Sequence, residues 1–594
     1  MILAALNDYY HYLLDREQED IAPFGYSQEK ISYALVLSPN GELVDVQDLR
    51  DTSGKKPRAR SFMVPQPEKR TSGVKSNFLW DKSSYVLGVS SKTGERVLQE
   101  HEAFKSLHAD LLQHETDPSL RAVEQFLEQW TPEKYTANGL FNDDMLDANF
   151  VFRIDGEKGY VHEAPAAKRI RAEMIKSGAG DIAHCLVTGS QQPISRLHPA
   201  IKGVNGAQSS GASIVSFNLD AFSSFQKSQG NNAPVSEQVA FAYTTVLNHL
   251  LRRDEDNRQR LQIGDTTVVF WAKAHSAKQT QTAELLFADL FQPPAETDAS
   301  ETSRMRSALD AVAKGRPLNE FDPELAPNTE IFVLGLAPNA SRLSIRFWER
   351  GSLDLFARRL AQHYQDLNLA PSPWKTEPAV WRLLLETVPH REGAKRKLDD
   401  VQPLLAGEMT RAILTGRRYP RSLLTNLIMR MRADGDISSL RVSMCKGVLA
   451  RDRRLGVKGI ETEVPVSLET DNTDPGYLLG RLFATLENVQ QSAQGNSVNA
   501  TIRDRYYGAA SATPASVFPV LIRNAQNHLG KVRKEKPGLA VNLEKQMGEI
   551  VDLLGSSFPR SLRIEAQGRF AIGYYHQTQA RYTKSQVTAE EGEE

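Results

Sequence analysis

Residues 266–272 read T-T-V-V-F-W-A, and this apolar run decides the fold class of the middle of the chain. A second run, E-I-F-V-L-G-L, occupies residues 330–336. Short apolar stretches rich in β-branched and aromatic residues are typical of strands that are buried on both faces. We therefore expect two central strands here, a further strand at 344–348, and helix plus loop at 276–316.

Turn signals nearer the N-terminus predict a second set of strands. Asn40-Gly41 separates A-L-V-L from L-V-D-V, and an Asn-Gly pair between apolar runs is a strong signal of a β-hairpin. The other expectations are a helix over 1–14, a long loop over 48–77, strand-like sequence over 78–89, two helices broken near Asp117-Pro118, a hairpin of 150–154 with 159–162, strands at 185–188 and 213–217, and a helix over 237–252.

Apolar residues adopt helical spacing toward the C-terminus, where Leu479, Leu482, Phe483 and Leu486 fall on one face. The predicted helices cover 403–415, 422–431, 440–450, 517–534 and 568–583, with another around 543–554. The expected fold class is α+β, with mixed N-terminal and central sheet-containing regions followed by a C-terminal helical bundle. We place the four regions at 1–180, 181–375, 376–470 and 471–594.

Composition bounds the classes of protein that the chain could represent. Its 594 residues are too many for one core, and no apolar run reaches the roughly 18 residues of a membrane span. We expect no signal peptide, no membrane partner and no cofactor. The two cysteines, Cys185 and Cys445, lie far apart, which argues against a disulfide framework and fits a cytoplasmic location.

The formal net charge of −1 argues against a uniformly basic nucleic-acid binder, but the charge is unevenly distributed. The basic segment, residues 55–75, carries seven cations against one acid, Glu68. Lysine and arginine can neutralise phosphates, and asparagine can reach base edges. A flexible solvated loop is the alternative. The candidate DNA contacts are Lys55, Lys56, Arg58, Arg60, Lys69, Arg70, Lys75 and Asn77, and the adjoining Phe78-Leu79-Trp80 could form an aromatic platform.

A second basic stretch, residues 391–458, holds 16 Lys/Arg against 7 Asp/Glu. Its predicted helices should carry arginines on their outer faces. Such faces could follow a nucleic-acid strand, or they could simply be solvated.

The stretch 197–217 surrounds the polar residues Gln208, Ser209 and Ser210 with glycines, among them Gly206. Glycine permits close approach of the backbone to another molecule, and the polar side chains can hydrogen-bond it. The spacing matches neither of the two familiar phosphate-binding loops. A loop that needs positive φ only for packing is an equally good interpretation from the residues alone.

Catalytic signatures are absent from the sequence. We find no zinc-protease, deaminase, α/β-hydrolase or kinase motif. Asp143, Asp144 and Asp147 could hold a divalent metal, which keeps a metal-dependent nuclease acting on DNA as an alternative. A solvated loop is the simpler interpretation of these carboxylates, and we expect a protein that is not an enzyme.

Several ordered motifs together resemble the large subunit of the type I-C CRISPR Cascade surveillance complex. These are C-L-V-T-G (185–189), L-H-P (197–199), I-K-G-V (201–204), G-A-Q-S-S-G-A (206–212), S-F-N (216–218), N-A-P-V-S (232–236), I-G-D-T (263–266), F-W (270–271), R-F-W (346–348), D-R-Y-Y-G-A-A-S (504–511) and G-Y-Y (573–575). One departure is Phe225-Gln226, where a Tyr-Gly pair is expected.

The resemblance implies a non-catalytic, crRNA-guided antiviral role. In such complexes base pairing reads the target, and a protein reads the short duplex motif called the PAM. The large subunit is expected to recognise the PAM in double-stranded DNA, to promote duplex opening and R-loop formation, and to recruit the helicase–nuclease. The implied partners are crRNA, target DNA, the Cascade backbone subunits, the crRNA 5′-end subunit and the small subunit, which the C-terminal bundle resembles. A purely architectural RNA- and protein-binding scaffold is the other alternative.

Overall fold

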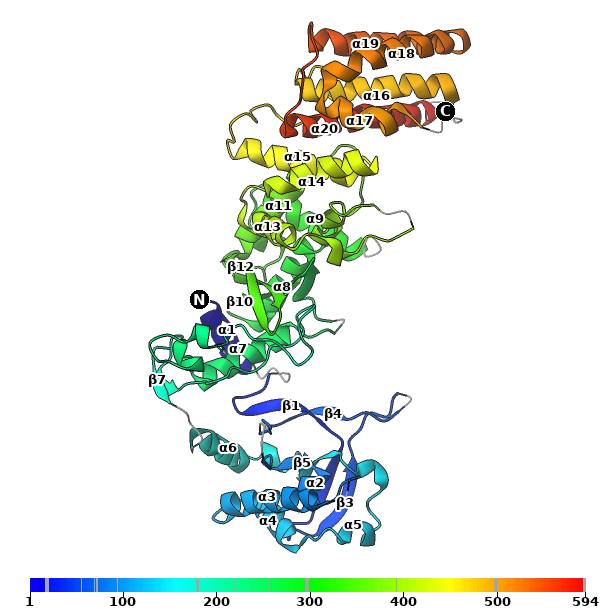
Figure 1. The fold of residues 1–594 in the computed structure, drawn as a ribbon. Helices are drawn as coiled ribbons and strands as arrows, with labels where there is room; N and C mark the ends of the chain where they lie inside the picture. The colour runs from blue at the N-terminus through cyan, green and yellow to red at the C-terminus, as the bar shows by residue number, and fades with distance from the viewer. Residues whose placement is uncertain are drawn as a thin grey trace. The chain divides into compact units, whose positions relative to one another are not determined.

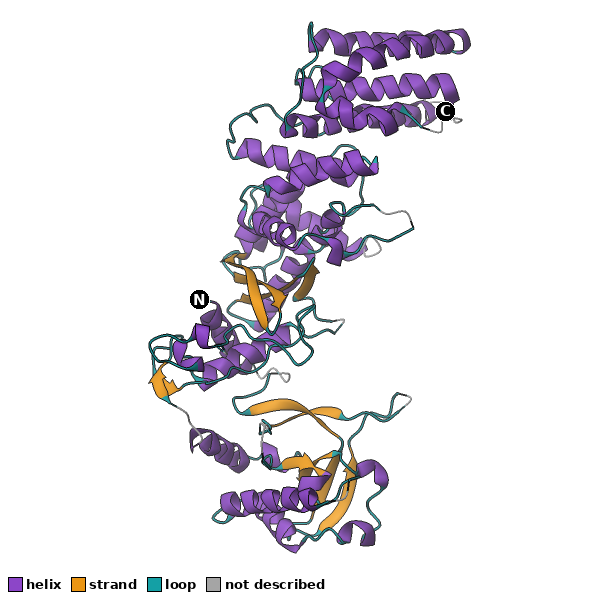
Figure 2. Cartoon of the chain, viewed as in Figure 1, coloured by secondary structure: helices purple, strands orange, loops and turns teal. Residues whose placement is uncertain are grey.

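The computed structural model has an α+β fold, as expected (Figure 1). The chain forms two compact units. Unit 1 comprises residues 1–201 and 215–249, and unit 2 comprises residues 202–214 and 250–594. Figure 2 shows strands in the N-terminal and central parts and helices toward the C-terminus. The structure describes residues 1–16, 21–54, 56–68, 70, 73–92, 94–177, 181–217, 219–254, 256–293, 299–390, 393–495 and 500–590.

Unit 1 contains a four-stranded mixed sheet in the order β3-β2-β6-β5. The predicted hairpin is confirmed: β2 (Tyr33–Leu37) pairs antiparallel with β3 (Leu43–Asp48) across the Asn40-Gly41 turn. β6 (Asn149–Ile154) pairs parallel with β2 and antiparallel with β5 (Trp80–Lys82). The predicted hairpin of β6 with 159–162 is wrong, because the chain there forms a 3₁₀ turn, Val161–Glu163.

A two-stranded ribbon of β1 (Tyr26–Ile31) and β4 (Arg60–Pro65) lies in the same unit. β4 falls inside the segment 48–77, so the prediction of a continuous loop is wrong. The strand-like sequence over 78–89 forms only β5, and the chain then enters α2 (Ser83–Val86).

Helices α3 (Glu95–Leu112) and α4 (Pro118–Gln129) cover the mixed sheet of unit 1. The predicted break between them is confirmed, because the Asp117 side chain accepts hydrogen bonds from the Ser119 and Leu120 amides and caps α4. Phe104, Phe126 and Phe152 join the sheet to both helices in one core. α5 (Lys134–Ala137) and α6 (Pro165–Ser177) follow along the chain.

The remainder of unit 1 consists of two α-helices, a short hairpin and the loops between them in the described residues. The predicted helix at its N-terminus is α1 (Ile2–Leu14), and the helix predicted over 237–252 is α7 (Glu237–Leu250). A short hairpin pairs β7 (Ile182–His184) with β8 (Gln191–Pro193). The predicted strand at 185–188 is wrong, because the Gly189 amide donates to the Cys185 carbonyl and closes a turn there.

Unit 2 is built on a four-stranded antiparallel sheet in the order β12-β11-β10-β9. The two apolar runs form its central strands, β10 (Thr266–Lys273) and β11 (Glu330–Asn339), as expected. β9 (Arg260–Ile263) and β12 (Arg342–Ser352) are the edges. α8 (Ala277–Phe291), α9 (Ala299–Ala313), α10 (Leu318–Phe321) and α11 (Leu353–Leu367) follow the strands and share their core.

Helices continue from the sheet of unit 2 to the C-terminal part of the chain. α13 (Pro403–Thr415), α14 (Arg421–Asp434) and α15 (Ser439–Arg454) confirm the three predicted helices, and α12 (Val380–Leu385) precedes them. α16 (Pro475–Gln494), α18 (Pro514–Glu535), α19 (Pro537–Leu554) and α20 (Ile564–Glu590) were also expected, whereas α17 (Ile502–Ala512) was not. One continuous hydrophobic core joins the sheet to the last helices.

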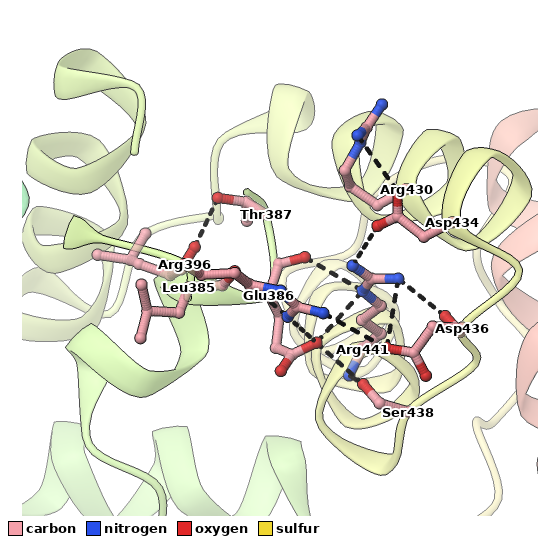
Figure 3. A network of polar contacts seen from close by, with 10 residues as sticks. Leu385, Glu386, Thr387, Arg396, Arg430, Asp434, Asp436, Ser438 and Arg441 are labelled. Carbon is pink, nitrogen blue, oxygen red and sulfur yellow. Dashed lines mark hydrogen bonds and ion pairs between the residues drawn. The ribbon is translucent and has the colours of Figure 1, made fainter. Parts of the chain in front are cut away.

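The expectation that α15 would carry its arginines on an outer face is wrong for Arg441 and Arg451, whose side chains are fully buried. Arg441 donates to the Asp434 carboxylate at 2.6 Å. Its guanidinium also forms an ion pair at 3.2 Å with Glu386, which directly follows α12 (Figure 3). Buried arginines need such partners because an isolated charge is strongly disfavoured away from water. The described exposed arginines of this region are Arg417, Arg418, Arg421, Arg432, Arg453 and Arg454.

Candidate nucleic-acid interface

The basic segment of unit 1, residues 55–75, includes β4 of the two-stranded ribbon. Arg60 begins β4, and the Arg58 backbone pairs with Asp51 in both directions, at 2.8 and 3.0 Å. Lys56, Arg58 and Arg60 are exposed. The predicted contacts Lys55 and Lys69 lie outside the described residues. The described part of the segment therefore presents cations on a paired backbone, which suits contact with phosphates.

Arg70 and Asn77 are engaged within unit 1 rather than directed to solvent. Asn77 is 3% exposed, and its side-chain oxygen accepts a hydrogen bond from the Glu68 amide at 3.0 Å. Arg70 donates through Nε to the Lys75 carbonyl at 2.7 Å and through Nη2 to the buried carboxylate of Asp81. Lys75 remains exposed. Of these three predicted contacts, Lys75 has the free side chain that a phosphate contact needs.

The predicted aromatic platform next to the basic segment is wrong. Phe78 and Trp80 are 1% and 3% exposed, and the Trp80 indole donates to the Pro65 carbonyl at 2.7 Å. Phe78 stacks on the His108 ring, with 5.7 Å between the ring centroids. These rings anchor the segment to the core, so they offer no surface on which a base could stack.

His108 holds the backbone next to these rings. Its Nε2 accepts a hydrogen bond from the Leu79 amide at 2.9 Å, and its Nδ1 lies 2.8 Å from the Phe104 carbonyl. These partners select the neutral tautomer with the proton on Nδ1. Leu79 needs this support because its φ of 61° is unfavourable for a residue with a side chain. Burial lowers the pKa of His108 to about 4.

The lowered pKa of His108 predicts acid destabilisation of unit 1. Between pH 6.5 and 4 the unfolded state binds the proton and the folded state does not, so stability falls as the pH falls through this window. From the two pKa values we expect His108 alone to reduce the free energy of unfolding by about 2 kcal/mol between pH 7 and pH 5. Urea unfolding followed by tryptophan fluorescence at both pH values measures the change.

The His108→Gln variant is the control for this pH dependence, because glutamine does not titrate and can still accept from the Leu79 amide. Its loss of stability over the same pH interval should be smaller by that amount. Equal losses in the variant and the parent would contradict the assignment.

The part of the glycine-rich stretch that surrounds Gln208, residues 202–214, belongs to unit 2. Its two ends are fixed on the sheet: the Asn205 amide donates to the Thr267 hydroxyl at 3.0 Å, and the Ser213 amide donates to the Ser341 carbonyl at 3.2 Å. Between these anchors Gly206, Gln208, Ser209 and Ser210 are exposed. The strand predicted at 213–217 is wrong, because only an isolated bridge from Ser213 to Arg342 forms there.

Packing explains one glycine of this stretch. Gly203 has a φ of 90°, and a Cβ at that position would lie 2.6 Å from the Leu251 carbonyl oxygen. The glycine is therefore required by the close approach of two backbone segments. The exposed tip carries the polar side chains, so Gly203 serves packing while Gln208 is accessible from solvent.

An exposed aromatic turn in unit 1, residues 224–227, is absent from the sequence-based list of contacts. Phe225 is 93% exposed, and the Lys227 amide donates to the Ser224 carbonyl at 2.9 Å. Phe225 and Gln226 have φ values of 49° and 60°, as the central residues of a type I′ hairpin turn do. Glycine and asparagine are usual in such turns. The sequence signal that could have revealed this turn is the departure from the expected Tyr-Gly pair at Phe225-Gln226.

A single side chain stiffens the base of this turn. The Asn232 side-chain oxygen accepts from the Ser224 amide at 3.0 Å, and its amide group donates to the Lys227 carbonyl at 3.0 Å. The same amide group donates to the Gln229 carbonyl at 3.1 Å. The Phe225 ring is thus exposed on a turn whose backbone is fixed by Asn232, and the basic residue Lys227 follows two positions later.

Residues 6–582 match the protein family described as CRISPR-associated protein (Cas_Csd1). The chain belongs to this family. The match spans both units and contains the basic segment, the Gln208 stretch and the Phe225 turn. The family is that of the large subunit of type I-C CRISPR Cascade, so the resemblance found in the sequence is confirmed. No curated protein matches the chain.

Two of the three carboxylates considered as metal ligands contact other side chains in this large subunit, and the third, Asp143, is exposed. Asp147 accepts hydrogen bonds from the hydroxyls of Ser90, at 2.6 Å, and Ser91, and Asp144 lies 3.5 Å from the Arg50 guanidinium. Among the described side chains, no three His, Cys, Asp or Glu residues come together as a metal site would require. Every helix in the described ranges is too short or too polar to cross a bilayer.

Proposed function

We propose that this chain recognises the PAM in double-stranded DNA within a crRNA-guided type I-C complex and opens the adjacent duplex. It does this without catalysing a reaction itself. Membership of the large-subunit family supports a place in the complex. The Phe225 turn is the observation that carries the opening step.

An aromatic ring on a braced turn suits insertion between base pairs. Proteins that kink or unstack DNA insert apolar side chains such as phenylalanine at a base step. Stacking of a base on an aromatic ring contributes about 1–3 kcal/mol. The two positive φ values at Phe225 and Gln226 are unfavourable for residues with side chains, and such strain is concentrated at functional sites. Exposure of the ring therefore favours a contact with DNA.

The exposed cations Lys56, Arg58, Arg60 and Lys75 belong to the same unit as this turn. They would bind duplex phosphates next to the PAM and hold the DNA in register, because phosphate contacts position a protein on DNA while base contacts specify sequence. Gln208, Ser209 and Ser210 of unit 2 would provide a second polar contact. R-loop formation would follow opening, and the completed R-loop would recruit the helicase–nuclease.

Replacing Phe225 by serine should slow opening of a PAM-containing duplex by about tenfold, because the ring no longer stacks on the exposed base. The assembled complex with crRNA is mixed with a duplex that carries 2-aminopurine at the first target positions, and the rise in fluorescence gives the opening rate. A duplex with mismatches at those positions is already open. On that duplex the Phe225→Ser complex should bind as fast as the parent.

The Leu219→Ser variant is the matched control, because Leu219 is a 56% exposed apolar residue of the same segment. It should open the duplex at the parental rate. Parental opening by the Phe225→Ser complex, or a defect that persists on the mismatched duplex, would contradict the proposed role of the turn.

A further inference from the structure

We propose that Asp81 is a positioning residue that fixes the C-terminal part of the basic segment, around Lys75, through Arg70 and Asn77. This inference rests on the proposed function of the large subunit. It assigns Arg70 and Asn77 to the support of the segment, and it leaves Lys75 as the cation that the support presents to DNA. The Asp81 network is defined as Arg70, Lys75, Asn77 and Asp81.

The carboxylate of Asp81 is at the centre of this network. Its side chain is 1% exposed, and Oδ2 accepts hydrogen bonds from the Asn77 amide, at 2.9 Å, and from Arg70 Nη2. Oδ1 accepts from the Lys82 amide at 2.8 Å. One buried carboxylate thus joins the strand β5 to the backbone and side chains of the segment that precedes it.

Arg70 connects this carboxylate to the surface. Its Nε donates to the Lys75 carbonyl at 2.7 Å, and its guanidinium carbon lies 4.1 Å from the centre of the Tyr85 ring in α2. The side chain of Arg70 is 26% exposed. The Lys75 backbone is therefore held by a guanidinium that is itself held on two sides, and the exposed Lys75 side chain projects from a fixed point.

Asn77 closes the other side of the segment. Its side-chain oxygen accepts from the Glu68 amide at 3.0 Å, which joins residues on either side of Arg70. Glu68 lies 3.4 Å from the buried guanidinium of Arg171, which also donates to the Gln66 carbonyl at 3.1 Å. The described ends of the segment are thus tied to each other and to α6.

Stability alone does not explain a buried carboxylate at this position. Burial of a charged pair is disfavoured by desolvation, and an apolar pair of similar volume often stabilises a protein as well or better. Burial also raises the pKa of Asp81, which is the sign of that desolvation. The Asp81–Arg70 pair fixes the backbone of the exposed Lys75, and this positioning explains why a buried charge is kept here.

The test measures PAM preference in the assembled complex with crRNA. PAM preference is the ratio of affinities for a PAM-containing duplex and the same duplex with the PAM replaced. The variants are Asp81→Asn, Arg70→Gln, the double variant and Lys75→Ala. Binding of single-stranded DNA complementary to the guide needs no PAM, so it reports whether each variant folds and assembles.

We expect Asp81→Asn and Arg70→Gln each to lower PAM preference about tenfold while single-strand binding stays at the parental level. The double variant should lose no more than either single variant, because both residues act through one network. Arg70→Gln should leave the dependence of affinity on salt concentration unchanged, whereas Lys75→Ala should reduce the slope of log K against log[salt] by about 0.9.

Three results would overturn the inference. They are parental PAM preference in Asp81→Asn, additive losses in the double variant, and a salt slope reduced by Arg70→Gln, which would make Arg70 a direct phosphate contact. Failure of the proposed function looks different, since the parental complex itself would then show no PAM preference. If the Asp81→Asn variant does not assemble, the PAM preference of Arg70→Gln decides the question. Arg70 is partly exposed, so water can take the place of its guanidinium and the variant can still fold.

Discussion

Replacing Asp366 by asparagine is expected to destabilise unit 2 by about 3–5 kcal/mol, which is the usual effect of leaving a buried charge without its partner. The side chain of Asp366 on α11 is 2% exposed and accepts from Arg451 Nε at 2.9 Å. Arg451 is fully buried on α15, and its guanidinium carbon lies 4.1 Å from the centre of the Tyr419 ring. Asparagine keeps the shape of the side chain and removes the charge that the guanidinium needs.

The matched control for Asp366 lies on the same helix. Asp354 pairs with Arg358 at 2.9 Å, and the Arg358 side chain is 62% exposed. The Asp354 side chain is partly buried at 19% exposure, but a pair whose cation is in solvent contributes about 0–1 kcal/mol, so Asp354→Asn should change stability little. Urea unfolding of both variants and the parent, followed by circular dichroism, measures the difference. A loss for Asp366→Asn no larger than that of Asp354→Asn would contradict the account of the buried pair.

Replacing Gly480 by alanine is expected to lower the free energy of unfolding of the C-terminal helices by about 1–3 kcal/mol, the usual range for an overpacked core. Gly480 on α16 faces α20, and a Cβ built there would lie 2.0 Å from the Phe570 carbonyl oxygen. Gly573 on α20 has the reciprocal contact, 2.1 Å from the Tyr477 carbonyl oxygen. The obstacle in each case is backbone, so the two helices must move apart to admit a methyl group.

Gly548 on α19 is the control for Gly480. A Cβ at Gly548 meets no atom within 4 Å, so Gly548→Ala tests helix propensity without a clash. It should stabilise the helix by roughly 0.5–1 kcal/mol, because alanine favours the helix over glycine. The melting temperature should therefore fall for Gly480→Ala and rise for Gly548→Ala. A melting temperature for Gly480→Ala equal to or above that of the parent would contradict the close packing of α16 on α20.

The parts of the fold that could be predicted from the sequence are those that local patterns encode. The apolar runs at 266–272 and 330–336 became the central strands β10 and β11, and the helical spacing near the C-terminus became α16 and α19. Asn40-Gly41 and Asp117-Pro118 marked a turn and a helix start through the chemistry of the residues themselves.

Contacts between residues far apart in sequence were the parts that could not be predicted. An arginine-rich helix is expected to be solvated unless its partners are known, and the carboxylate that pairs with Arg451 is Asp366, on another helix. Asn77 and Trp80 are polar or amphipathic and lie two residues from Lys75 and Lys82, respectively, yet both form hydrogen bonds with residues that precede β5. The 3₁₀ turn at Val161–Glu163 replaced a predicted strand because β6 finds its partners in β2 and β5.

The candidate interface was predicted in outline and changed in detail. The structure leaves Lys56, Arg58, Arg60 and Lys75 exposed, as a phosphate contact requires, and it exposes the tip of the Gln208 stretch. It moves Arg70 and Asn77 from the exposed surface to the support of the segment. The Phe225 turn was missed as a contact, because a single exposed ring in a polar loop has no periodic signal, and the unexpected Phe225-Gln226 pair marked the loop without indicating an exposed ring.

PAM preference of the complete complex tests the central claim most directly. The complex is assembled with crRNA and this chain, and its affinity is measured at one salt concentration for two duplexes that share the target sequence and differ only in the PAM. The account predicts much tighter binding of the PAM-containing duplex, and loss of that preference when this chain is left out of the assembly. Equal affinity for the two duplexes would contradict it and would favour an architectural scaffold.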